Sequence, residues 1–276
     1  MTPPLGLIAL VLLGTVACGS GDSDGDGLSD DLEESFGTDP ELADTDGDGL
    51  TDLEEYEGGT SGTAWDSDGD GYGDYDEVQE GTDPTDPESR IYQGGWPYNS
   101  EKGEMLDPGW EQAPQLGGTM PRLIVEDQFG DKVDLYDFAN QGVDVVLDIS
   151  TEWCAPCQQI AEWLDTGDHS NLVEYAWWDD SYVGIPDLVN SEKVYWITLL
   201  VQNQDHEPAD PSTVQNWYSN WPHPLIPVLL DEGQAVYQWI MPTGYPTINI
   251  LGEDMTFQTY TNRGADDAFV YLSEME

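Results

Sequence analysis

A six-residue acidic motif recurs three times, with a period of 22 residues, in the N-terminal third of the chain. The motif begins at Asp22, Asp44 and Asp66, and each copy has aspartate at its first, third and fifth positions and glycine at its sixth. A fixed period of this length is typical of repeat architectures in which each copy folds as one small unit. Residues 22–88 hold 26 of the 57 acidic side chains and no basic one. Without cations, we expect their mutual repulsion and the shortage of apolar side chains to keep this segment disordered.

Each copy matches a twelve-position calcium-binding loop. In such loops oxygen ligands come from positions 1, 3, 5, 7, 9 and 12, and glycine makes the sharp turn at position 6. Hard oxygen ligands favour Ca²⁺ over softer metals, and folding is then coupled to binding. The sequence predicts about three calcium sites; a solvated acidic linker that binds nothing specifically is the alternative. The predicted ligands are Asp22, Asp24, Asp26, Leu28, Asp30 and Glu33; Asp44, Asp46, Asp48, Leu50, Asp52 and Glu55; and Asp66, Asp68, Asp70, Tyr72, Asp74 and Glu77.

These repeats leave room for about one short helix between successive loops, so they do not form paired helix–loop–helix units. They resemble the bacterial relatives of thrombospondin type 3 repeats, which wrap around calcium without a large hydrophobic core. This resemblance implies an irregular calcium-loop array over residues 22–88 that acts as a calcium-stiffened spacer or an adhesive stalk.

An apolar segment, Leu5–Val16, precedes the repeats. It has the length of the hydrophobic part of a signal peptide and is too short to span a bilayer. The small residues before Cys18 resemble a bacterial lipoprotein cleavage site, which implies a signal peptide at 1–17, lipidation of Cys18 and a tether at 18–21. Gly19 suggests sorting to an outer membrane. We therefore expect an exported protein, in the periplasm or at the cell surface, held to the membrane by its lipid; secretion as a soluble product is the alternative.

The chain has a formal net charge of −51, with 57 acidic and 6 basic side chains. A field of this sign repels nucleic acid and anionic membrane surfaces, and it favours cationic partners or metal ions. We expect no nucleic-acid partner. Broad surface acidity, as in salt-tolerant exported proteins, explains the same charge without any partner.

The region after Gln112 alternates strand-like and helix-like patterns, which is typical of an α/β domain. Runs of Val, Leu and Ile predict the strands, and apolar residues at helical spacing predict the helices. The expected strands are 123–126 and 132–135, which form a hairpin, then 143–149, 194–201, 227–230 and 247–251; the expected helices are 157–164, 211–218 and 266–272.

A Cys-x-x-Cys pair, Cys154 and Cys157, follows the strand expected at 143–149. At a helix N-terminus, unpaired N–H groups and the helix dipole lower the pKa of a thiol such as that of Cys154. Cys157 lies one turn further on, close enough for a disulfide with Cys154. The pair is therefore predicted to exchange disulfides through a mixed disulfide. A zinc or copper site and a purely structural disulfide are the alternatives; zinc normally needs four ligands, and no second Cys pair exists.

Two segments resemble thioredoxins. Val146–Cys157 is similar to the active-site strand and turn, and Tyr245–Leu251 is similar to the cis-proline turn and the strand that follows it. The hairpin and Pro227–Asp231 look more like the TlpA-like and ResA-like redoxins, which are exported, membrane-anchored thiol–disulfide enzymes. The resemblance covers residues 113–276 and implies a thioredoxin-like fold with a central mixed sheet flanked by helices. Residues 89–112 are then a linker, whose aromatic side chains we expect to pack onto this domain.

The same resemblance implies roles for single residues. Asp148 would be the buried acid that manages the proton of the resolving cysteine, although a plain structural acid is the alternative. The bond before Pro246 would be cis, and the backbone of Tyr245 would pair with the substrate. Gln158 stands where a basic residue is common, and the acidic domain opposes a low thiol pKa, so the direction of electron flow is left open. The implied catalytic residues are Cys154, Cys157, Asp148 and Pro246, and the implied substrate-binding residues are Trp153 and Tyr245.

The sequence thus favours a thiol–disulfide oxidoreductase that reduces or isomerises disulfides in protein substrates and is recharged by an upstream redox partner, without an organic cofactor. One alternative is a calcium-dependent surface adhesion protein in which the thioredoxin fold only binds partners. Another is a copper-delivery protein that uses the cysteine pair.

Overall fold

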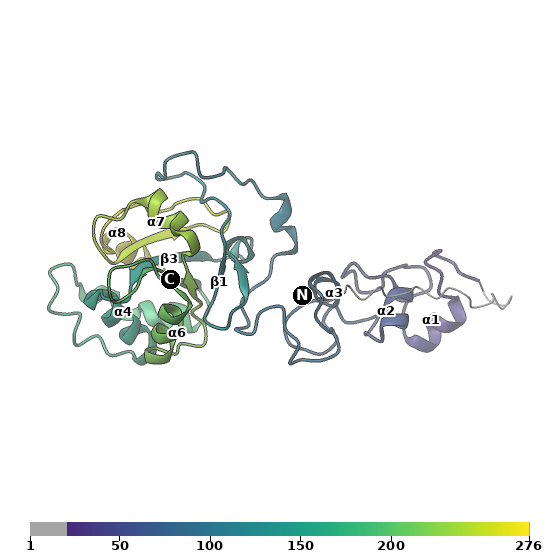
Figure 1. Cartoon of the computed structure of the whole chain (residues 1–276). Helices are drawn as coiled ribbons and strands as arrows, with labels where there is room; N and C mark the ends of the chain where they lie inside the picture. The colour runs from purple at the N-terminus through teal and green to yellow at the C-terminus, as the bar shows by residue number, and fades with distance from the viewer. Residues whose placement is uncertain (1–20, 276) are drawn as a thin grey trace, which may run out of the picture. The chain divides into compact units, whose positions relative to one another are not determined.

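The computed structural model describes residues 21–275. The predicted signal peptide and the predicted lipidation site Cys18 lie outside the described residues. The chain forms two compact units, one ending at Glu88 and the other spanning Ser89–Glu276 (Figure 1). Within residues 21–275, none of the helices is both long enough and apolar enough to cross a bilayer.

The first unit repeats a loop followed by one short helix. The helices α1 (Asp30–Phe36), α2 (Asp52–Gly58) and α3 (Asp74–Glu80) have seven residues each. Each is followed by a glycine in the left-handed region, where a residue without Cβ is favoured, and the N–H of that glycine closes the helix. One apolar side chain per loop is buried, so the apolar core of this unit is small. The glycines are Gly37, Gly59 and Gly81, and the buried side chains are Leu28, Leu50 and Tyr72.

The second unit contains a four-stranded sheet with the order β5-β4-β3-β6. Strands β3 (Asp144–Thr151), β4 (Val194–Gln202) and β5 (Val228–Leu230) are parallel, and β6 (Thr247–Leu251) is antiparallel to β3. The residues of β3, β4 and β6 are almost all buried, which explains their near-continuous apolar sequences. A separate antiparallel hairpin, β1 (Ile124–Glu126) and β2 (Lys132–Asp134), precedes the sheet, as predicted.

Five α-helices in residues 89–275 pack around this sheet. The face of the sheet that carries Val146, Ile248 and Ile250 shares one core with α4, α5 and α8. The helix α6 packs beside β4 and β5, and its Trp217 shares a second core with the start of α4, close to it in Figure 1. This is a thioredoxin-like fold. It is defined by the order of the strands, by the connection from β3 through α4 to β4, and by the antiparallel strand β6 followed by α8. The helices are α4 (Ala155–Thr166), α5 (Ile185–Asn190), α6 (Pro211–Asn220), α7 (Ala235–Ile240) and α8 (Asp266–Ser273).

Residues 89–112, which the sequence suggests are a linker, belong to the second compact unit. The Tyr92 hydroxyl donates to Asp137 Oδ2 at 2.6 Å, and Trp96 Nε1 donates to Asp127 Oδ2 at 2.7 Å. The predicted packing of these aromatics onto the domain is confirmed. Apart from a 3₁₀ helix at Ser100–Glu104, the segment is irregular and therefore lacks periodicity, so sequence patterns alone do not reveal that it is part of the unit.

This segment also supplies the counter-ion of a buried carboxylate. Asp137 lies in a 3₁₀ turn (Leu135–Phe138) with a fully buried side chain, and Lys102 Nζ lies 2.7 Å from its Oδ1. Burial raises the pKa of Asp137, whereas Lys102 and Tyr92 act in the opposite direction.

Replacing Lys102 by Met is expected to lower the free energy of unfolding by about 3 kcal/mol, because it leaves a buried carboxylate without its counter-ion. Urea unfolding followed by tryptophan fluorescence measures this loss. The control is Lys132→Met, because Lys132 is more than half exposed and its ion pairs with Glu126 and Glu232 are screened by water. Equal losses in both variants would contradict the structural importance of the Lys102 pair.

Candidate active site and candidate calcium loops

The cysteine pair lies where β3 passes into α4. Cys154 is the N-cap residue of α4, and its Sγ accepts a hydrogen bond from the backbone N–H of Cys157 at 3.2 Å. Pro156 fits here because a residue in the first turn needs no N–H partner. Cys154 and Cys157 form a disulfide with their Cα atoms 5.3 Å apart. The arrangement places one sulfur at a helix N-terminus, where a thiolate is stabilised after reduction.

Both sulfurs lie in apolar surroundings. Cys154 is 3% exposed and Cys157 is fully buried. Burial in apolar surroundings disfavours a thiolate and therefore opposes the effect of the helix N-terminus on the pKa of Cys154. A substrate therefore reaches the two sulfurs only if the side chains at the edge of this cluster move aside or themselves contact the substrate. The buried neighbours in this cluster are Leu200, Val214, Trp217, Val228 and Leu230, with Trp153 and Tyr245 partly buried beside them.

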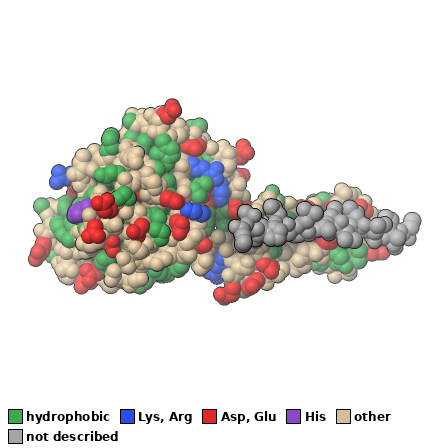
Figure 2. Space-filling view, viewed as in Figure 1, with side chains coloured by type: hydrophobic (Ala, Val, Ile, Leu, Met, Phe, Trp, Pro, Cys, Tyr) green, Lys and Arg blue, Asp and Glu red, His purple; other side chains and the backbone are tan. Residues whose placement is uncertain are grey.

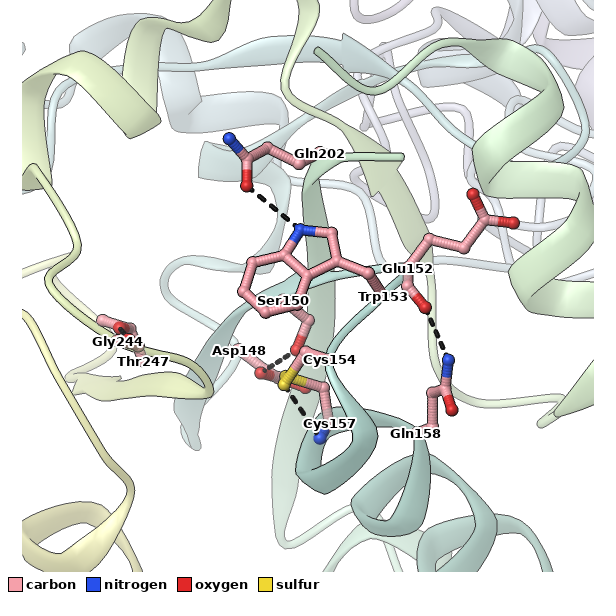
Figure 3. The surroundings of a disulfide bond; sticks show 10 residues. All are labelled: Asp148, Ser150, Glu152, Trp153, Cys154, Cys157, Gln158, Gln202, Gly244 and Thr247. Atoms are coloured by element: carbon pink, nitrogen blue, oxygen red, sulfur yellow. Dashed lines mark hydrogen bonds between the residues drawn. A yellow bond between two sulfur atoms is a disulfide. The ribbon is translucent and has the colours of Figure 1, made fainter. Parts of the chain in front are cut away.

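Trp153, predicted to contact substrate, is held by Gln202, which Figure 3 shows, and by the rings of His206 and Tyr245. Its Nε1 donates to Gln202 Oε1 at 3.2 Å. Its ring lies 4.5 Å from the His206 ring and meets the Tyr245 ring edge to face at 5.6 Å. Through Trp153, these contacts connect three segments: the end of β4 (Gln202), the loop after it (His206) and the turn before β6 (Tyr245). The role of Trp153 in substrate binding stays a prediction.

Glu152 and Gln158 brace the turn before Cys154, and sequence reasoning assigned neither of them a role. Gln158 Nε2 donates to the backbone oxygen of Glu152 at 2.5 Å, so this residue, found where a basic one is common, has a structural partner. The Glu152 carboxylate accepts the backbone N–H of Gln204 at 2.9 Å. The second contact spans 52 positions, and for this reason no local pattern reveals it.

The peptide bond between Tyr245 and Pro246 is cis, as the resemblance to thioredoxins implied. Thr247 Oγ1 donates to the backbone oxygen of Gly244 at 2.7 Å and closes this turn (Figure 3). The Tyr245 hydroxyl is buried without a hydrogen-bond partner among the described residues, and burial raises the pKa of Tyr245.

Asp148 is buried in the middle of β3, with 2% of its surface exposed. Its side chain points to the same face of the sheet as Val146, two positions earlier, and that face is covered by α4. Burial raises the pKa of Asp148 to about 7, although the Ser150 hydroxyl and the Trp196 indole act in the opposite direction. Figure 3 draws Asp148 and Ser150 among the residues in the surroundings of the disulfide. A carboxyl group with this pKa can take up or release a proton near neutral pH.

The domain is acidic overall, with 31 of the 57 acidic side chains outside residues 22–88. Acidic side chains are scattered over the face seen in Figure 2, with few basic ones among them. Lys102, Arg122 and Lys132 form ion pairs with carboxylates of their own unit. The surplus of negative charge disfavours a thiolate on either cysteine of the reduced pair. Added salt screens this charge and so weakens the effect.

The three candidate calcium loops bring their carboxylates together. In each loop the aspartates at positions 1, 3 and 5 place one oxygen each within 4.8 Å of the others. The glutamates at position 12, Glu33, Glu55 and Glu77, are fully buried. Neither carboxylate oxygen of Glu33 or of Glu55 has a hydrogen-bond partner among the described residues.

Burial is the main cause that raises the pKa of Glu33 to about 7, of Glu55 to about 8 and of Glu77 to about 7. The neighbouring aspartates act in the same direction, whereas a hydrogen bond from Thr82 opposes the shift of Glu77. Buried carboxylates without partners are costly unless a cation compensates them. An all-oxygen donor set with a carboxylate at its closing position suits Ca²⁺. The residues present therefore fit a calcium ion in each loop, and their individual roles as ligands stay predictions.

The aspartates at position 9 already have partners within their loops. Asp52 accepts from the backbone N–H of Thr45 at 2.9 Å and from its hydroxyl at 2.8 Å, and Asp74 accepts from Ser67 in the same way. Asp30 accepts from Ser23 in the first loop. These carboxylates brace the start of the loop. The spacing of the motif predicts them as ligands but does not show where their oxygens point.

The aspartates at position 5 join consecutive repeats, which the sequence did not indicate. Asp26 Oδ2 accepts the backbone N–H of Leu53, in the first turn of α2, at 2.9 Å. Asp48 Oδ2 accepts the backbone N–H of Tyr75, in the first turn of α3, at 3.2 Å. The first and second loops thus each supply an acceptor to the helix of the next repeat, at the end where negative charge is favourable.

Solved structures similar to this chain include several thiol–disulfide proteins. A thiol:disulfide interchange protein from Bacteroides sp. aligns with 15% identity and a TM-score of 0.41 over 59% of this chain and 91% of its own. StoA from Bacillus subtilis aligns with 15% identity and a TM-score of 0.37, over 58% of this chain and 100% of its own. A secreted Mycobacterium tuberculosis disulfide oxidoreductase aligns with 15% identity and a TM-score of 0.36, over 55% and 93%. At these values the fold is established by the strand order and connections described above, not by the neighbours.

No curated protein matches the sequence of the chain. The family model described as bacterial TSP3 repeat matches residues 22–40, 44–60 and 66–87. These ranges coincide with the three loops and the helices that follow them. The chain therefore carries bacterial TSP3 repeats, followed by a domain of thioredoxin-like fold with a disulfide between Cys154 and Cys157.

Proposed function

We propose that this protein is a thiol–disulfide oxidoreductase that reduces or isomerises disulfides in other proteins. The observation that carries the proposal is the Cys154–Cys157 disulfide at the N-terminus of α4, which shares a cluster with Tyr245 of the cis-proline turn and has the buried Asp148 in its surroundings. The helix end favours a thiolate on Cys154, and the buried acid offers a proton acceptor for the second thiol.

In the reduced protein, the Cys154 thiolate attacks one sulfur of a substrate disulfide. A Cys154–substrate disulfide forms, the substrate disulfide breaks, and the second substrate sulfur leaves as a thiolate that takes up a proton. Cys157 then passes its thiol proton to the Asp148 carboxylate and attacks the Cys154 sulfur. The Cys154–Cys157 disulfide re-forms, the remaining substrate sulfur is released, and two electrons have passed to the substrate. A dithiol partner upstream restores the reduced pair.

The N-terminal part of the chain supports a location outside the cytoplasm. We propose export by the segment 1–17, attachment to an outer membrane through lipidated Cys18, and a stalk made by the TSP3 repeats with calcium bound. When bound, calcium compensates the buried carboxylates of the loops. The substrates are then disulfide-containing proteins of the periplasm or cell surface.

Reduction of insulin disulfides, followed by turbidity with dithiothreitol as electron donor, tests the enzymatic proposal. The chain is expected to raise the rate clearly above that of dithiothreitol alone. A rate equal to this background, at several concentrations of folded protein, would contradict the proposal.

Asp148→Asn is expected to slow the second step of the cycle by about 100-fold, because an amide cannot accept the proton of Cys157. In the wild type the ionised fraction of Asp148 increases with pH through a pKa of about 7, so the rate should rise across neutrality. In Asp148→Asn this rise should be absent. Stopped-flow measurement of the release of a substrate thiol between pH 5.5 and 8.5 provides the comparison.

An independent check uses stability, because burial raises the pKa of Asp148 above its ordinary value. The folded protein then holds this proton more tightly than the unfolded chain, so the contribution of the group is fully present at low pH and is lost as pH rises through about 7. Asp148→Asn should therefore lose less stability between pH 5 and 8 than the wild type. An identical loss in both proteins would rule out the raised pKa.

A further inference from the structure

Ser150 lies two positions after Asp148 on β3, and the two side chains share one face of the sheet. Ser150 is fully buried, and its Oγ donates to Asp148 Oδ1 at 2.7 Å (Figure 3). Nothing in the cysteine motif assigns a role to this serine, because it lies on the strand rather than in the turn.

Among the described residues, no charged side chain shifts the pKa of the Asp148 carboxyl group. The paired residues on the adjacent strands are Thr198 of β4 and Ile248 of β6, and α4 covers this face with Cys157 near its start. The Ser150 hydroxyl and the Trp196 indole are the groups that favour the ionised form, and no charged side chain contributes. Ser150 donates a hydrogen bond of ordinary length to the carboxylate, whereas Trp196 Nε1 has no partner within hydrogen-bonding geometry among the described residues.

We propose that Ser150 is a positioning residue of the redox site, whose hydroxyl orients the Asp148 carboxyl group and sets the pH range in which it accepts the proton of Cys157. The inference rests on the proposed function and names a residue that controls its second step. In that step the proton moves from Cys157 Sγ to a carboxylate oxygen of Asp148, while the Ser150 proton stays on its hydroxyl and Oδ1 is held in place.

The hydrogen bond matters because the Asp148 carboxyl group titrates near neutral pH. A donor to a carboxylate stabilises the ionised form, so its removal raises the pKa. The loss of one such bond corresponds to a shift of about one pH unit. At pH 7 such a shift would lower the ionised fraction of Asp148, and with it the rate of the second step, by about fivefold.

The experiment follows the ¹³Cγ chemical shift of Asp148 with pH in the oxidised chain, in which neither cysteine titrates. Ser150→Ala is expected to raise the titration midpoint by about one pH unit. Thr151→Val is the matched control: Thr151 is the next residue on the strand and is equally buried, and its hydroxyl has no hydrogen-bond partner among the described residues. It should titrate as the wild type does.

Ser150→Thr keeps a hydroxyl at this position and is expected to restore the wild-type midpoint, which separates the hydrogen bond from the effects of packing. An unchanged midpoint in folded Ser150→Ala, or equal shifts in Ser150→Ala and Ser150→Thr, would overturn the proposal. The titration does not depend on catalysis. If the wild type fails to reduce insulin while Ser150→Ala still shifts the midpoint, the proposed function fails and the link between Ser150 and Asp148 stands.

Discussion

Replacing Cys154 by Ser is expected to reduce insulin reduction by the chain to the background rate of dithiothreitol. The structure places the Cys154 sulfur at the N-terminus of α4, and in the proposed cycle this atom attacks the substrate disulfide. A serine hydroxyl cannot form the mixed disulfide, and removal of a nucleophile costs at least about a thousandfold in rate. The turbidity assay measures this loss directly.

The companion variant Cys157→Ser gives a different and equally specific result. It retains the attacking sulfur but lacks the second one, so a covalent complex with the substrate should accumulate, visible by mass spectrometry and released by excess reductant. Both variants remove the same buried disulfide, so each serves as the control for stability of the other. Wild-type rates in Cys154→Ser would exclude the cysteine pair as the reactive group.

Removal of calcium is expected to unfold the repeat unit, and Glu55→Gln is expected to weaken the middle loop selectively. Glu55 is fully buried, and both of its carboxylate oxygens lack partners among the described residues. Loss of an outer partner of a metal ligand typically costs 10–100-fold in affinity, so loss of the charge on the closing ligand itself should cost at least about 100-fold. Isothermal titration calorimetry of the full chain should then show one fewer tight site, and circular dichroism should show helix loss on adding a chelator.

Glu57→Gln provides the matched control for this measurement. Glu57 lies two positions further along α2 with an exposed side chain, so the same change in charge occurs on the same helix outside the loop. Its calcium stoichiometry and affinities should remain close to those of the wild type. Equal weakening by both substitutions would show that the array attracts calcium by its overall charge and not through built sites.

Local patterns in the sequence predicted most of the elements that position the site. The apolar run at β3, the Cys154 turn and the helical spacing within α4 are neighbours along the chain, so a short window contains the whole signal. The helices α5 and α7 were missed because six residues are too few to show a helical period. The calcium motif predicted the three loops, but it did not show which carboxylate oxygens point into each loop and which are bonded to neighbouring residues of the loop.

Contacts between distant segments escaped prediction for a physical reason. The bond from the Gln204 backbone N–H to Glu152, and the ion pair between Lys102 and the buried Asp137, depend on how the chain folds back on itself. The role of Ser150 depends on the burial of two strand residues under α4, which a short apolar strand does not reveal by itself.

The hydrogen bonds that the backbone N–H groups of Leu53 and Tyr75 donate to Asp26 and Asp48 connect the three repeats in series. In a linear assembly of this kind each copy is supported only by its immediate neighbours. The middle copy takes part in both connections, whereas each end copy takes part in one. A defect in the middle therefore isolates the first copy from the third, while a defect at either end leaves a connected pair.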